Sequence, residues 1–392
     1  MKLFVLLPRV PYPIEKGDKL RAFHQLKVLA EENEVILCAL SEDKIHPDAY
    51  TKLIDIVGKV HFISFSKWDA FKNILKSLIN GKPLQVGYYT NERARRKINK
   101  LLDYYKPDHI YAQLLRVAEY VKDQPVKKTL DYQDAFSSNI KRRAQQEFFL
   151  FKPLFYFEAN RLKKYEKEIF SWFDNKTIIS IPDRELINHP DKKKIAIIPN
   201  GVDTSFFYPR NQEKHYDLVF TGNMNYPPNI HGAEFLIKSV LPIVLKKRPE
   251  TKVLLSGANP HSRVKALAGK NVDVSGWVDD IRNSYASASV FIAPMQIGTG
   301  LQNKLLEAMA MKLPCITSEL ANSSLNATPD KEILIGNTAE EYAHHIATLL
   351  QYKEKRESLA ENGYEFVMQN YDWYQATKKL EKIMLGTHSQ DA

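Results

Sequence analysis

The sequence predicts two α/β domains of similar size, each built on a parallel sheet with helices on both faces, a doubly wound arrangement. Three features of the chain indicate this fold. Its 392 residues are too many for one ordinary hydrophobic core and suit two. Hydrophobic residues make up 44% and charged residues 26%, as in globular proteins. Short apolar runs alternate with helical patterns in both halves, which is typical of β-α-β units.

The first half contains the strands and helices of one such domain. Residues 3–7 form an apolar run of strand length, and residues 18–31 repeat apolar side chains at helical spacing. Further short apolar runs predict strands at residues 35–40, 60–65, 109–112 and 128–130. We expect this N-terminal Rossmann-like domain to span residues 1–187.

The second half repeats the pattern. Strands are expected at residues 217–221, 252–256, 272–275, 290–293 and 314–317, and helices at 230–247, 262–268, 280–286 and 301–312. The prolines and the lysine run between residues 188 and 209 suit a junction. The second Rossmann-like domain is therefore expected over residues 188–370, facing the first across a cleft. Residues 371–392 complete the chain as a helix that crosses back to the first domain, followed by a tail.

Cysteine usage and hydropathy exclude several classes of protein. Cys38 and Cys315 lie far apart in apolar runs and form no Cys-x-x-Cys pair, so we expect neither a disulfide framework nor a structural zinc site. The apolar run at the N-terminus ends at Pro8 and is too short for a signal peptide. Nowhere do 18 apolar residues occur together. We expect a cytoplasmic protein, either soluble or peripheral on the inner face of the cell membrane.

The positive charge is concentrated in the first half. The formal net charge is +10, and residues 1–190 carry 33 basic and 24 acidic side chains, a net charge of +9. Nucleic-acid binding is one interpretation, but no helix-turn-helix, zinc or RNA-binding signature accompanies the charge, so no nucleic-acid partner is expected. Between Lys141 and Lys167, basic clusters flank an aromatic block at residues 148–157. This suits an anionic membrane surface, and a hairpin packed on the first domain is the alternative.

The strongest site signal lies in residues 293–311. A buried strand ends there, a loop containing Gly298 and Gly300 follows, and a helix-forming run begins at Leu301. Glycines let the backbone approach a ligand closely, and the free N–H groups of a helix start favour a phosphate. A tight strand–helix turn without a ligand is the alternative.

Two charged side chains of the same run strengthen the ligand interpretation. Lys304 adds a positive charge near the helix start, where it suits a phosphate. Glu307 lies one turn after Asn303 and is followed by small and apolar residues, so its carboxylate is not expected on a freely solvated face. Such a carboxylate can accept hydrogen bonds from two neighbouring hydroxyls, as in a ribose.

Several segments, in order, resemble family 4 glycosyltransferases, which have the GT-B fold. Gln-Asn-Lys-Leu-Leu-Glu-Ala-Met-Ala at residues 302–310 resembles the family's diphosphate helix. Residues 198–203 resemble the family's interdomain motif, and residues 220–224 resemble the first strand of its donor domain with the following loop. Residues 275–280 resemble its base-contacting turn, and residues 16–21 its N-terminal loop. The resemblance covers the whole chain and is closest to sugar transferases of bacterial exopolysaccharide systems.

The chain departs from the family pattern at three places. The first of two glutamates that the family usually carries eight positions apart is replaced by Thr299. No Lys or Arg occurs between Gly222 and Gly232, and Gln113 stands where many members have a histidine. Sugar recognition is therefore less well predicted than nucleotide binding.

The resemblance implies a retaining, metal-independent glycosyltransferase of the hexosyltransferase type. Its co-substrate would be a nucleoside-diphosphate sugar, with no cofactor, and its acceptor a glycan or a lipid-linked sugar in cell-surface polysaccharide synthesis. Catalytic roles fall to Glu307, Lys304 and, through its backbone N–H, Gly17. The residues expected to bind the donor are Gly298, Thr299, Gly300, Leu301, Gln302, Asn303, Asn223 and Trp277. Trp277 either stacks near the base or plugs its domain.

The acceptor-side candidates follow strand ends of the first domain. They are Gln113, Arg116 and Asp131, together with Arg21 in the N-terminal loop motif. Asp131 is a candidate base, and for Asp134 a helix cap is the favoured role. Two other functions stay open: a nucleotide-sugar epimerase of the same fold, and a catalytically inactive relative that only binds a sugar nucleotide.

Overall fold

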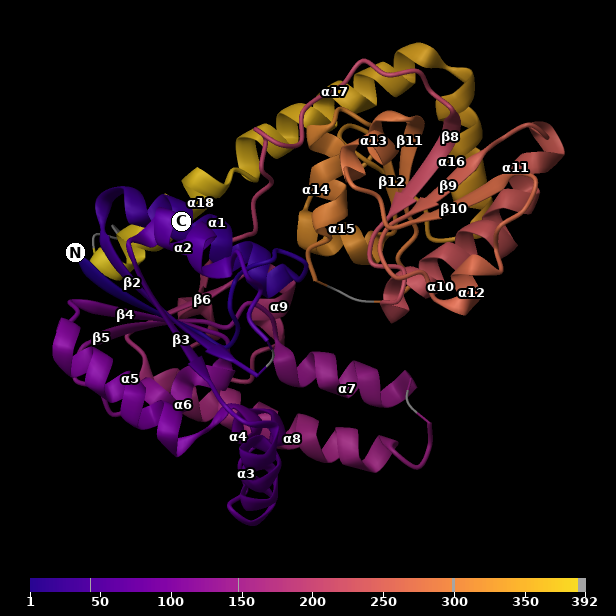
Figure 1. The fold of residues 1–392 in the computed structure, drawn as a ribbon. Coiled ribbons are helices and arrows are strands. Elements are labelled where there is room, and N and C mark those ends of the chain that lie inside the picture. Colours follow the sequence, from indigo (N-terminus) through magenta and orange to yellow (C-terminus); the bar gives the residue numbers. More distant parts are fainter. Residues whose placement is uncertain (43, 147, 298–299, 387–392) are drawn as a thin grey trace. The chain divides into compact units, whose positions relative to one another are not determined.

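The chain folds into two compact units. The computed structural model describes residues 1–42, 44–146, 148–297 and 300–386. Unit 1 consists of Met1–Pro199 together with the chain from Trp373 onward, and unit 2 of Asn200–Asp372. Both units are parallel α/β layers, which confirms the predicted fold class (Figure 1).

Unit 1 is built on a seven-stranded parallel sheet with the strand order β3-β2-β1-β4-β5-β6-β7. The central strand β1 pairs with β2 and β4 in register Leu3↔Val35 and Leu3↔His109. Alternate residues of β1 enter opposite cores because successive side chains of a strand point to opposite faces. The strands are β1 Lys2–Leu7, β2 Glu34–Ser41, β3 Lys59–Ser64, β4 His109–Gln113, β5 Lys127–Asp131, β6 Asn175–Ile178 and β7 Ala196–Ile197.

Helices cover both faces of this sheet. Helices α1, α2 and α18 contribute Leu26, Leu53 and Leu380 to one core, and α5 contributes Ile98 to the other. No helix among the described residues is long and apolar enough to cross a bilayer. The helices are α1 Gly17–Glu32, α2 Ala49–Val57, α3 Lys67–Ile79, α4 Leu84–Tyr89, α5 Glu92–Tyr105, α6 Ala118–Val121, α7 Phe136–Gln146, α8 Lys152–Ile169, α9 Ile181–Leu186 and α18 Trp373–Leu385.

Both junctions between the units differ slightly from the expected boundaries. Residues 188–199 belong to unit 1, because β7 extends its sheet in register Thr177↔Ala196. The last helix, α18, also belongs to unit 1, where Trp373 stacks on His24 at 5.1 Å between ring centres. Tyr371 stays with unit 2, since its carbonyl accepts the N–H of Val202 at 2.8 Å.

Unit 2 carries a six-stranded parallel sheet with the order β10-β9-β8-β11-β12-β13 and one continuous core. The expected helix 230–247 begins earlier, at Pro227, and is interrupted by a π-helical stretch at Leu236–Val240. The strands are β8 Tyr216–Thr221, β9 Val253–Ser256, β10 Val272–Gly276, β11 Ala288–Ala293, β12 Cys315–Thr317 and β13 Leu334–Ile335. The helices are α10 Pro227–Phe235, α11 Leu241–Lys247, α12 Ser262–Lys265, α13 Ile281–Ala286, α14 Asn303–Ala310, α15 Glu319–Leu325, α16 Ala339–Gln351 and α17 Lys353–Asn370.

Candidate functional site

The strand order of unit 2 defines where a ligand is expected. From β8 the chain adds β9 and β10 on one side of the sheet and then returns to add β11 and β12 on the other. Ligands of open α/β sheets bind beyond the carboxyl ends of the strands at such a reversal. Here that place is formed by the loop after β8, which begins at Gly222, and the loop that connects β11 to α14.

Two glycines hold the loops of this edge close together. Gly222 and Gly257 adopt φ of +148° and +142°, and a Cβ on Gly257 would lie 1.8 Å from the carbonyl oxygen of Gly222. A Cβ on Gly222 would lie 2.7 Å from Nδ2 of Asn229 and 3.2 Å from Nζ of Lys304. Only residues without a side chain fit at both positions, so the glycines bring the loops after β8 and β9 against the start of α14.

Lys304 lies in the first turn of α14 and is half-buried beneath the β8 loop. Its Nζ donates to Oδ1 of Asn229 and lies 4.8 Å from the ring centre of Phe220. Asn229 is held in turn by its Nδ2, which donates to the carbonyl of Asn223 at 2.9 Å. Burial lowers the pKa of Lys304 to about 7, and the charge of Glu307 opposes this shift. An anion placed beside Nζ would therefore favour the charged lysine.

Glu307 lies one turn further along α14 and is oriented by a buried tyrosine. Tyr285 donates its hydroxyl to Oε2 of Glu307 at 2.6 Å, and its oxygen lies 2.7 Å from Oγ1 of Thr221. Tyr285 is fully buried. Burial raises the pKa of Glu307, while the Tyr285 hydrogen bond and Lys304 lower it. Among the described residues no group donates to Oε1, which leaves this oxygen to accept hydroxyls of a ligand.

Four of the remaining predicted donor residues, Gly300 to Asn303, lie at the start of α14 or just before it. Gln302 donates its Nε2 to the carbonyl of Gly300 at 2.8 Å, and Asn303, the first residue of α14, accepts at 3.2 Å from Asn200. Leu301 packs against the core of unit 2. Gly298 and Thr299 lie outside the described residues, so the structure gives no account of them.

Trp277 and Asn223 lie on the loops of the same edge. Trp277 follows β10 and is 68% exposed, so its ring does not plug the core of unit 2. The alternative role, stacking on a base, stays a prediction. Asn223 accepts the N–H of Asn225 at 3.0 Å through its side chain. Its carbonyl, as described above, positions Asn229.

Sequence reasoning did not identify Tyr285, Thr221 or Asn229, although Tyr285 bonds to Glu307, Asn229 bonds to Lys304, and Thr221 bonds to Tyr285. Tyr285 lies within the predicted helix 280–286, and Thr221 ends a predicted strand, so both were placed on elements but not given a role. The available signal was a polar side chain at a strand end and a lone tyrosine on a short helix beside that strand. Neither pattern is specific without the fold.

In unit 1, the structure places Arg21 and Asp131 in a buried ion pair. Nε of Arg21 donates to Oδ2 of Asp131 at 2.6 Å, and both side chains have an exposed fraction of 0%. Asp131 also accepts from Tyr111 and Thr177, each at 3.0 Å. This carboxylate is saturated and charge-compensated, which corrects the expectation that Asp131 acts as a base and that Arg21 faces the acceptor.

Gln113 and Arg116 follow the end of β4 and differ in what they offer a ligand. Gln113 is buried and donates to Oε1 of Gln25 at 2.8 Å. The Arg116 guanidinium lies 5.2 Å from the ring centre of Tyr89 and 4.9 Å from that of Phe136. Its Nε is buried without a hydrogen-bond partner among the described residues. Arg116 is thus the acceptor-side candidate with an unused donor.

Asp134 does not cap a helix, contrary to expectation. Helix α7 begins at Phe136, and it is Glu166 that accepts the N–H of Ser137 at 2.8 Å. Oδ1 of Asp134 is buried without a partner among the described residues. Burial, reinforced by the charges of Asp183 and Glu166, raises the pKa of Asp134 to about 7.

Gly17 is the first residue of α1 and is exposed, and a Cβ there would meet nothing within 4 Å. Its neighbour Asp18 pairs with Arg9 at 2.8 Å. A small hollow beside these residues also involves Lys19 and Gln113. The predicted contact between the Gly17 N–H and a phosphate stays a prediction.

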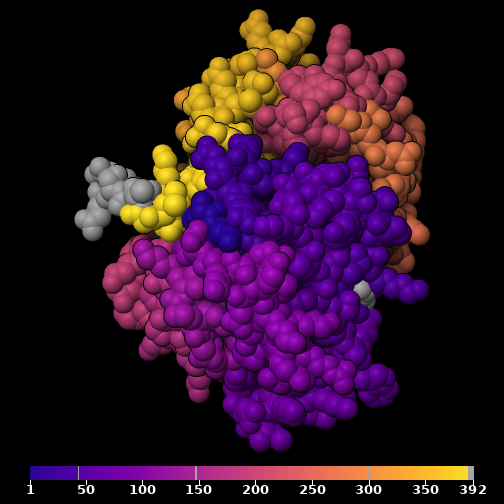
Figure 2. Space-filling model, turned by 60° about the vertical axis from the view of Figure 1, so that its left-hand side comes forward, coloured from indigo at the N-terminus to yellow at the C-terminus, as the bar shows by residue number. Residues whose placement is uncertain are grey.

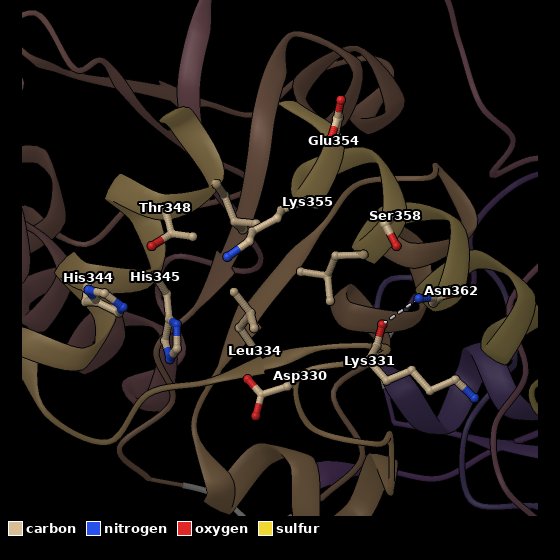
Figure 3. A pocket seen from close by; sticks show the side chains of 12 residues that line it. Asp330, Lys331, Leu334, His344, His345, Thr348, Glu354, Lys355, Ser358 and Asn362 are labelled. Carbon is tan, nitrogen blue, oxygen red and sulfur yellow. Dashed lines mark hydrogen bonds between the residues drawn. The ribbon is translucent and has the colours of Figure 1, made fainter. Parts of the chain in front are cut away.

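A larger cavity of about 560 Å³ lies elsewhere in unit 2 (Figure 3). It is lined by α16, α17 and the segment before β13, and includes His345, Lys355 and Asp330. Nε2 of His345 lies 2.9 Å from the carbonyl of Ile335. No residue of the cluster around Glu307 lines this cavity, so cavity size alone does not identify the site.

Comparison with known proteins agrees with this placement. Residues 215–352 match the family model described as glycosyl transferases group 1. An "Uncharacterized 44.6 kDa protein in cps region" of Klebsiella pneumoniae is 24% identical over 396 residues, which cover 95% of this chain and 96% of the relative.

Two solved structures resemble the whole chain. Sucrose-phosphate synthase (tll1590) from Thermosynechococcus elongatus has a TM-score of 0.70 at 15% identity and covers 99% of each chain. Anabaena Alr3699/HepE in complex with UDP and glucose has a TM-score of 0.71 at 14% identity and covers 99% of this chain and 100% of that chain. At such identities the likeness shows the fold alone. The chain has the GT-B fold, and a segment of unit 2, residues 215–352, is similar to the group 1 glycosyl transferases.

Proposed function

We propose that this protein is a retaining glycosyltransferase that transfers a sugar from a nucleoside-diphosphate donor to a glycan or lipid-linked acceptor in cell-surface polysaccharide synthesis. The observation that carries the proposal is the Glu307–Tyr285–Thr221 chain of hydrogen bonds at the switch point of the unit 2 sheet. The relative from a cps region and the neighbour solved with UDP and glucose support the substrate class.

Glu307 is proposed to bind the ribose of the donor. Tyr285 occupies Oε2 and fixes the carboxylate plane, so Oε1 is presented to the hydroxyls of the ligand. A carboxylate that accepts two adjacent hydroxyls distinguishes a ribonucleotide from a nucleotide that lacks them. Because Tyr285 is fully buried, it holds the Glu307 carboxylate in place before the donor binds. Little conformational entropy of this side chain is then lost on binding.

Lys304 and the start of α14 are proposed to hold the diphosphate. Negative charge develops on the diphosphate as the bond to the sugar breaks, so positive groups fixed nearby stabilise the transition state. Lys304 would exchange its hydrogen bond to Asn229 for a phosphate oxygen, and the helix dipole acts in the same direction. Its lowered pKa means that the arriving diphosphate raises the protonated fraction of Lys304.

The proposed reaction retains the anomeric configuration and requires no metal ion. Asp279 and Asp280 are adjacent acidic residues in the turn after β10. Asp280 already caps α13 and forms ion pairs with Arg282 at 2.8 Å and Arg210 at 3.1 Å. The positive charge that a diphosphate needs is proposed to come from Lys304 and backbone N–H groups instead. We place the acceptor on unit 1 and the protein on the cytoplasmic side of the membrane.

A donor screen followed by turnover tests the proposal. UDP-, GDP- and ADP-sugars are compared by thermal shift, and the best donor is then supplied with a labelled sugar in the presence and absence of EDTA. We expect one nucleotide to raise Tm, labelled sugar to leave the donor with or without EDTA, and the product anomer to match the donor. Absence of binding across the set would refute the proposal. Binding without turnover would support the inactive relative, and interconversion of the sugar on the nucleotide would support the epimerase.

A further inference from the structure

Helix α3 of unit 1 carries its apolar side chains on the outside. They recur at spacings of three and four residues and so lie on one helical face. Their exposed fractions range from 43% for Leu78 to 86% for Ile79. The residues of this face are Trp68, Phe71, Leu75, Leu78 and Ile79. A surface helix normally shows the opposite arrangement.

The inner face of α3 explains why the helix cannot simply turn over. Ala70 and Ser77 are buried there, and a Cβ on Gly87 of α4 would lie 1.8 Å from Oγ of Ser77. Asn73 on the same side donates its Nδ2 to the carbonyl of Thr90 at 2.6 Å. The helix is seated on α4 by small and polar side chains, so its apolar face stays outward.

The hairpin of α7 and α8 presents a second set of exposed apolar residues. Its connection places four of them in sequence, with exposed fractions between 55% and 65%. The first turns of α8 add two more. The set consists of Phe148, Phe149, Leu150, Phe151, Leu154 and Phe157. Most side chains of the aromatic block are therefore exposed and do not pack against the core of unit 1. Such packing was the alternative interpretation of this segment.

Arg161 of α8 joins the two sets. Its guanidinium donates to the carbonyls of Ser77 and Leu78 at 2.9 Å and of Lys82 at 3.0 Å, and so caps the end of α3. The same guanidinium stacks at 4.1 Å on the ring of Phe157. In Figure 1 α3 and the hairpin both extend beyond the sheet of unit 1, and α3 forms the protrusion at the lower end of Figure 2. We call the two sets together the α3–hairpin surface.

Exposed basic side chains flank this surface. Lys72 and Lys76 follow one border of the apolar face of α3, and Lys67 lies at the other border. Lys141, Arg143, Lys163 and Lys164 are exposed on the hairpin. No carboxylate among the described residues forms an ion pair with Lys72 or Lys76. An apolar helical face bordered by lysines matches the interface of an anionic bilayer, where the apolar groups enter the acyl boundary and the ammonium groups reach the headgroups.

We propose that the α3–hairpin surface docks unit 1 onto an anionic lipid bilayer, with α3 lying in the plane of the interface. A second copy of the chain fits less well, because pairing two such surfaces would bring their lysine borders together. The proposal does not depend on the transfer reaction: a protein that transferred no sugar would still bind vesicles. Together with the proposed function, it would bring the protein to acceptors that are anchored in the membrane.

Vesicle sedimentation tests the docking surface. Wild-type protein is mixed with protein-free vesicles of phosphatidylcholine, with and without phosphatidylglycerol, at low and high salt. We expect binding to the anionic vesicles that weakens with salt. Phe71→Glu with Leu75→Glu should abolish it, whereas Tyr104→Glu, a matched control that is 77% exposed on α5, should not. Lys72→Gln with Lys76→Gln should weaken binding about 10-fold or more, and the exposed pair Lys246→Gln with Lys247→Gln in unit 2 should leave it unchanged.

Fluorescence gives a second readout on the same surface. Lipids brominated in the acyl chain should quench Trp68 when α3 enters the bilayer, and Trp68→Phe should remove most of that quenching. Trp277→Phe, which removes a similarly exposed ring from unit 2, should not. Equal binding to both vesicle types, unchanged binding of the Phe71→Glu with Leu75→Glu variant, or undiminished quenching in Trp68→Phe would each overturn the proposal. So would a wild-type dimer that the α3 variant dissociates while vesicle binding persists.

Discussion

Replacing Glu307 with glutamine removes a negative charge from the proposed ribose site while keeping the size and the hydrogen-bonding plane of the side chain. Tyr285 donates to Glu307 at 2.6 Å, so the amide oxygen of the glutamine is expected to face Tyr285. The amide nitrogen then replaces Oε1, the oxygen proposed to accept the ribose hydroxyls. The substitution exchanges a charge-assisted acceptor for a neutral donor at that one position.

The expected loss follows from the hydrogen bonds involved. A hydrogen bond to a charged group contributes about 1.5–3 kcal/mol. Losing one such bond weakens binding of the nucleoside diphosphate about 10-fold to about 150-fold. The free energy of unfolding should change by less than about 1 kcal/mol, because the Tyr285 bond is kept. Calorimetric titration measures the first quantity and urea unfolding the second.

A nucleotide that lacks the ribose hydroxyls isolates the interaction. Wild type should bind the 2′,3′-dideoxy form more weakly than the ribonucleotide, whereas Glu307→Gln should bind both with similar affinity, so that the two losses do not add. Glu340→Gln, at an exposed position in the first turn of α16, is the control and should bind as wild type does. Additive losses in the variant and the dideoxy nucleotide, or normal binding by Glu307→Gln, would refute the assignment.

Three further substitutions test the physical account of the two units. Burial lowers the pKa of Lys304 to about 7 from an ordinary 10.5, so the folded state binds fewer protons and its stability should rise between about pH 7 and about pH 10. Lys304→Met should lose that rise in urea unfolding, and an unchanged pH slope would contradict the burial of its ammonium group. The pKa of Asp134 is raised to about 7, so the protonated side chain contributes to the stability of the folded state below about pH 4. This contribution is lost as the pH rises through about 7. Asp134→Asn should then match wild type at pH 4 and exceed its stability at pH 8; equal stability at both pH values would disprove this. Gly257→Ala should cost at least about 3 kcal/mol, because its Cβ meets a backbone oxygen, whereas Gly269→Ala has open space and should change stability by less than about 0.5 kcal/mol. Similar losses for both glycines would show that close approach is not the reason for Gly257.

Local patterns were sufficient to predict most strands and the main signal of the site. Apolar runs such as residues 3–7 became central strands because a parallel sheet covered on both faces buries every side chain of such a run. Glu307 could be assigned to the same helical face as Asn303, since residues four apart on a helix lie one turn apart on one face. Both inferences use spacings of a few residues, which the sequence states directly.

The second half was predicted better than the details of the first. The end of the unit 1 sheet was misplaced because β7 has only two residues, too few to show a strand period. Asp131 and Asp134 look alike in sequence, three positions apart after the same strand. The fold pairs Asp131 with Arg21 and leaves an oxygen of Asp134 without a partner. Such a distinction depends on which side chains meet from distant elements.

By itself the sequence determined two parallel α/β units and predicted a phosphate-binding strand–helix turn with a carboxylate beside it. Only the tertiary structure decided what orients that carboxylate, because Tyr285 reaches Glu307 from a different helix and is itself bonded to Thr221 from a strand. It also decided which face of α3 meets solvent. An amphipathic pattern predicts that a helix has an apolar face, but it does not say whether that face points to the core or to solvent. In α3 this is decided by the packing of Ser77 against Gly87, a contact between two helices.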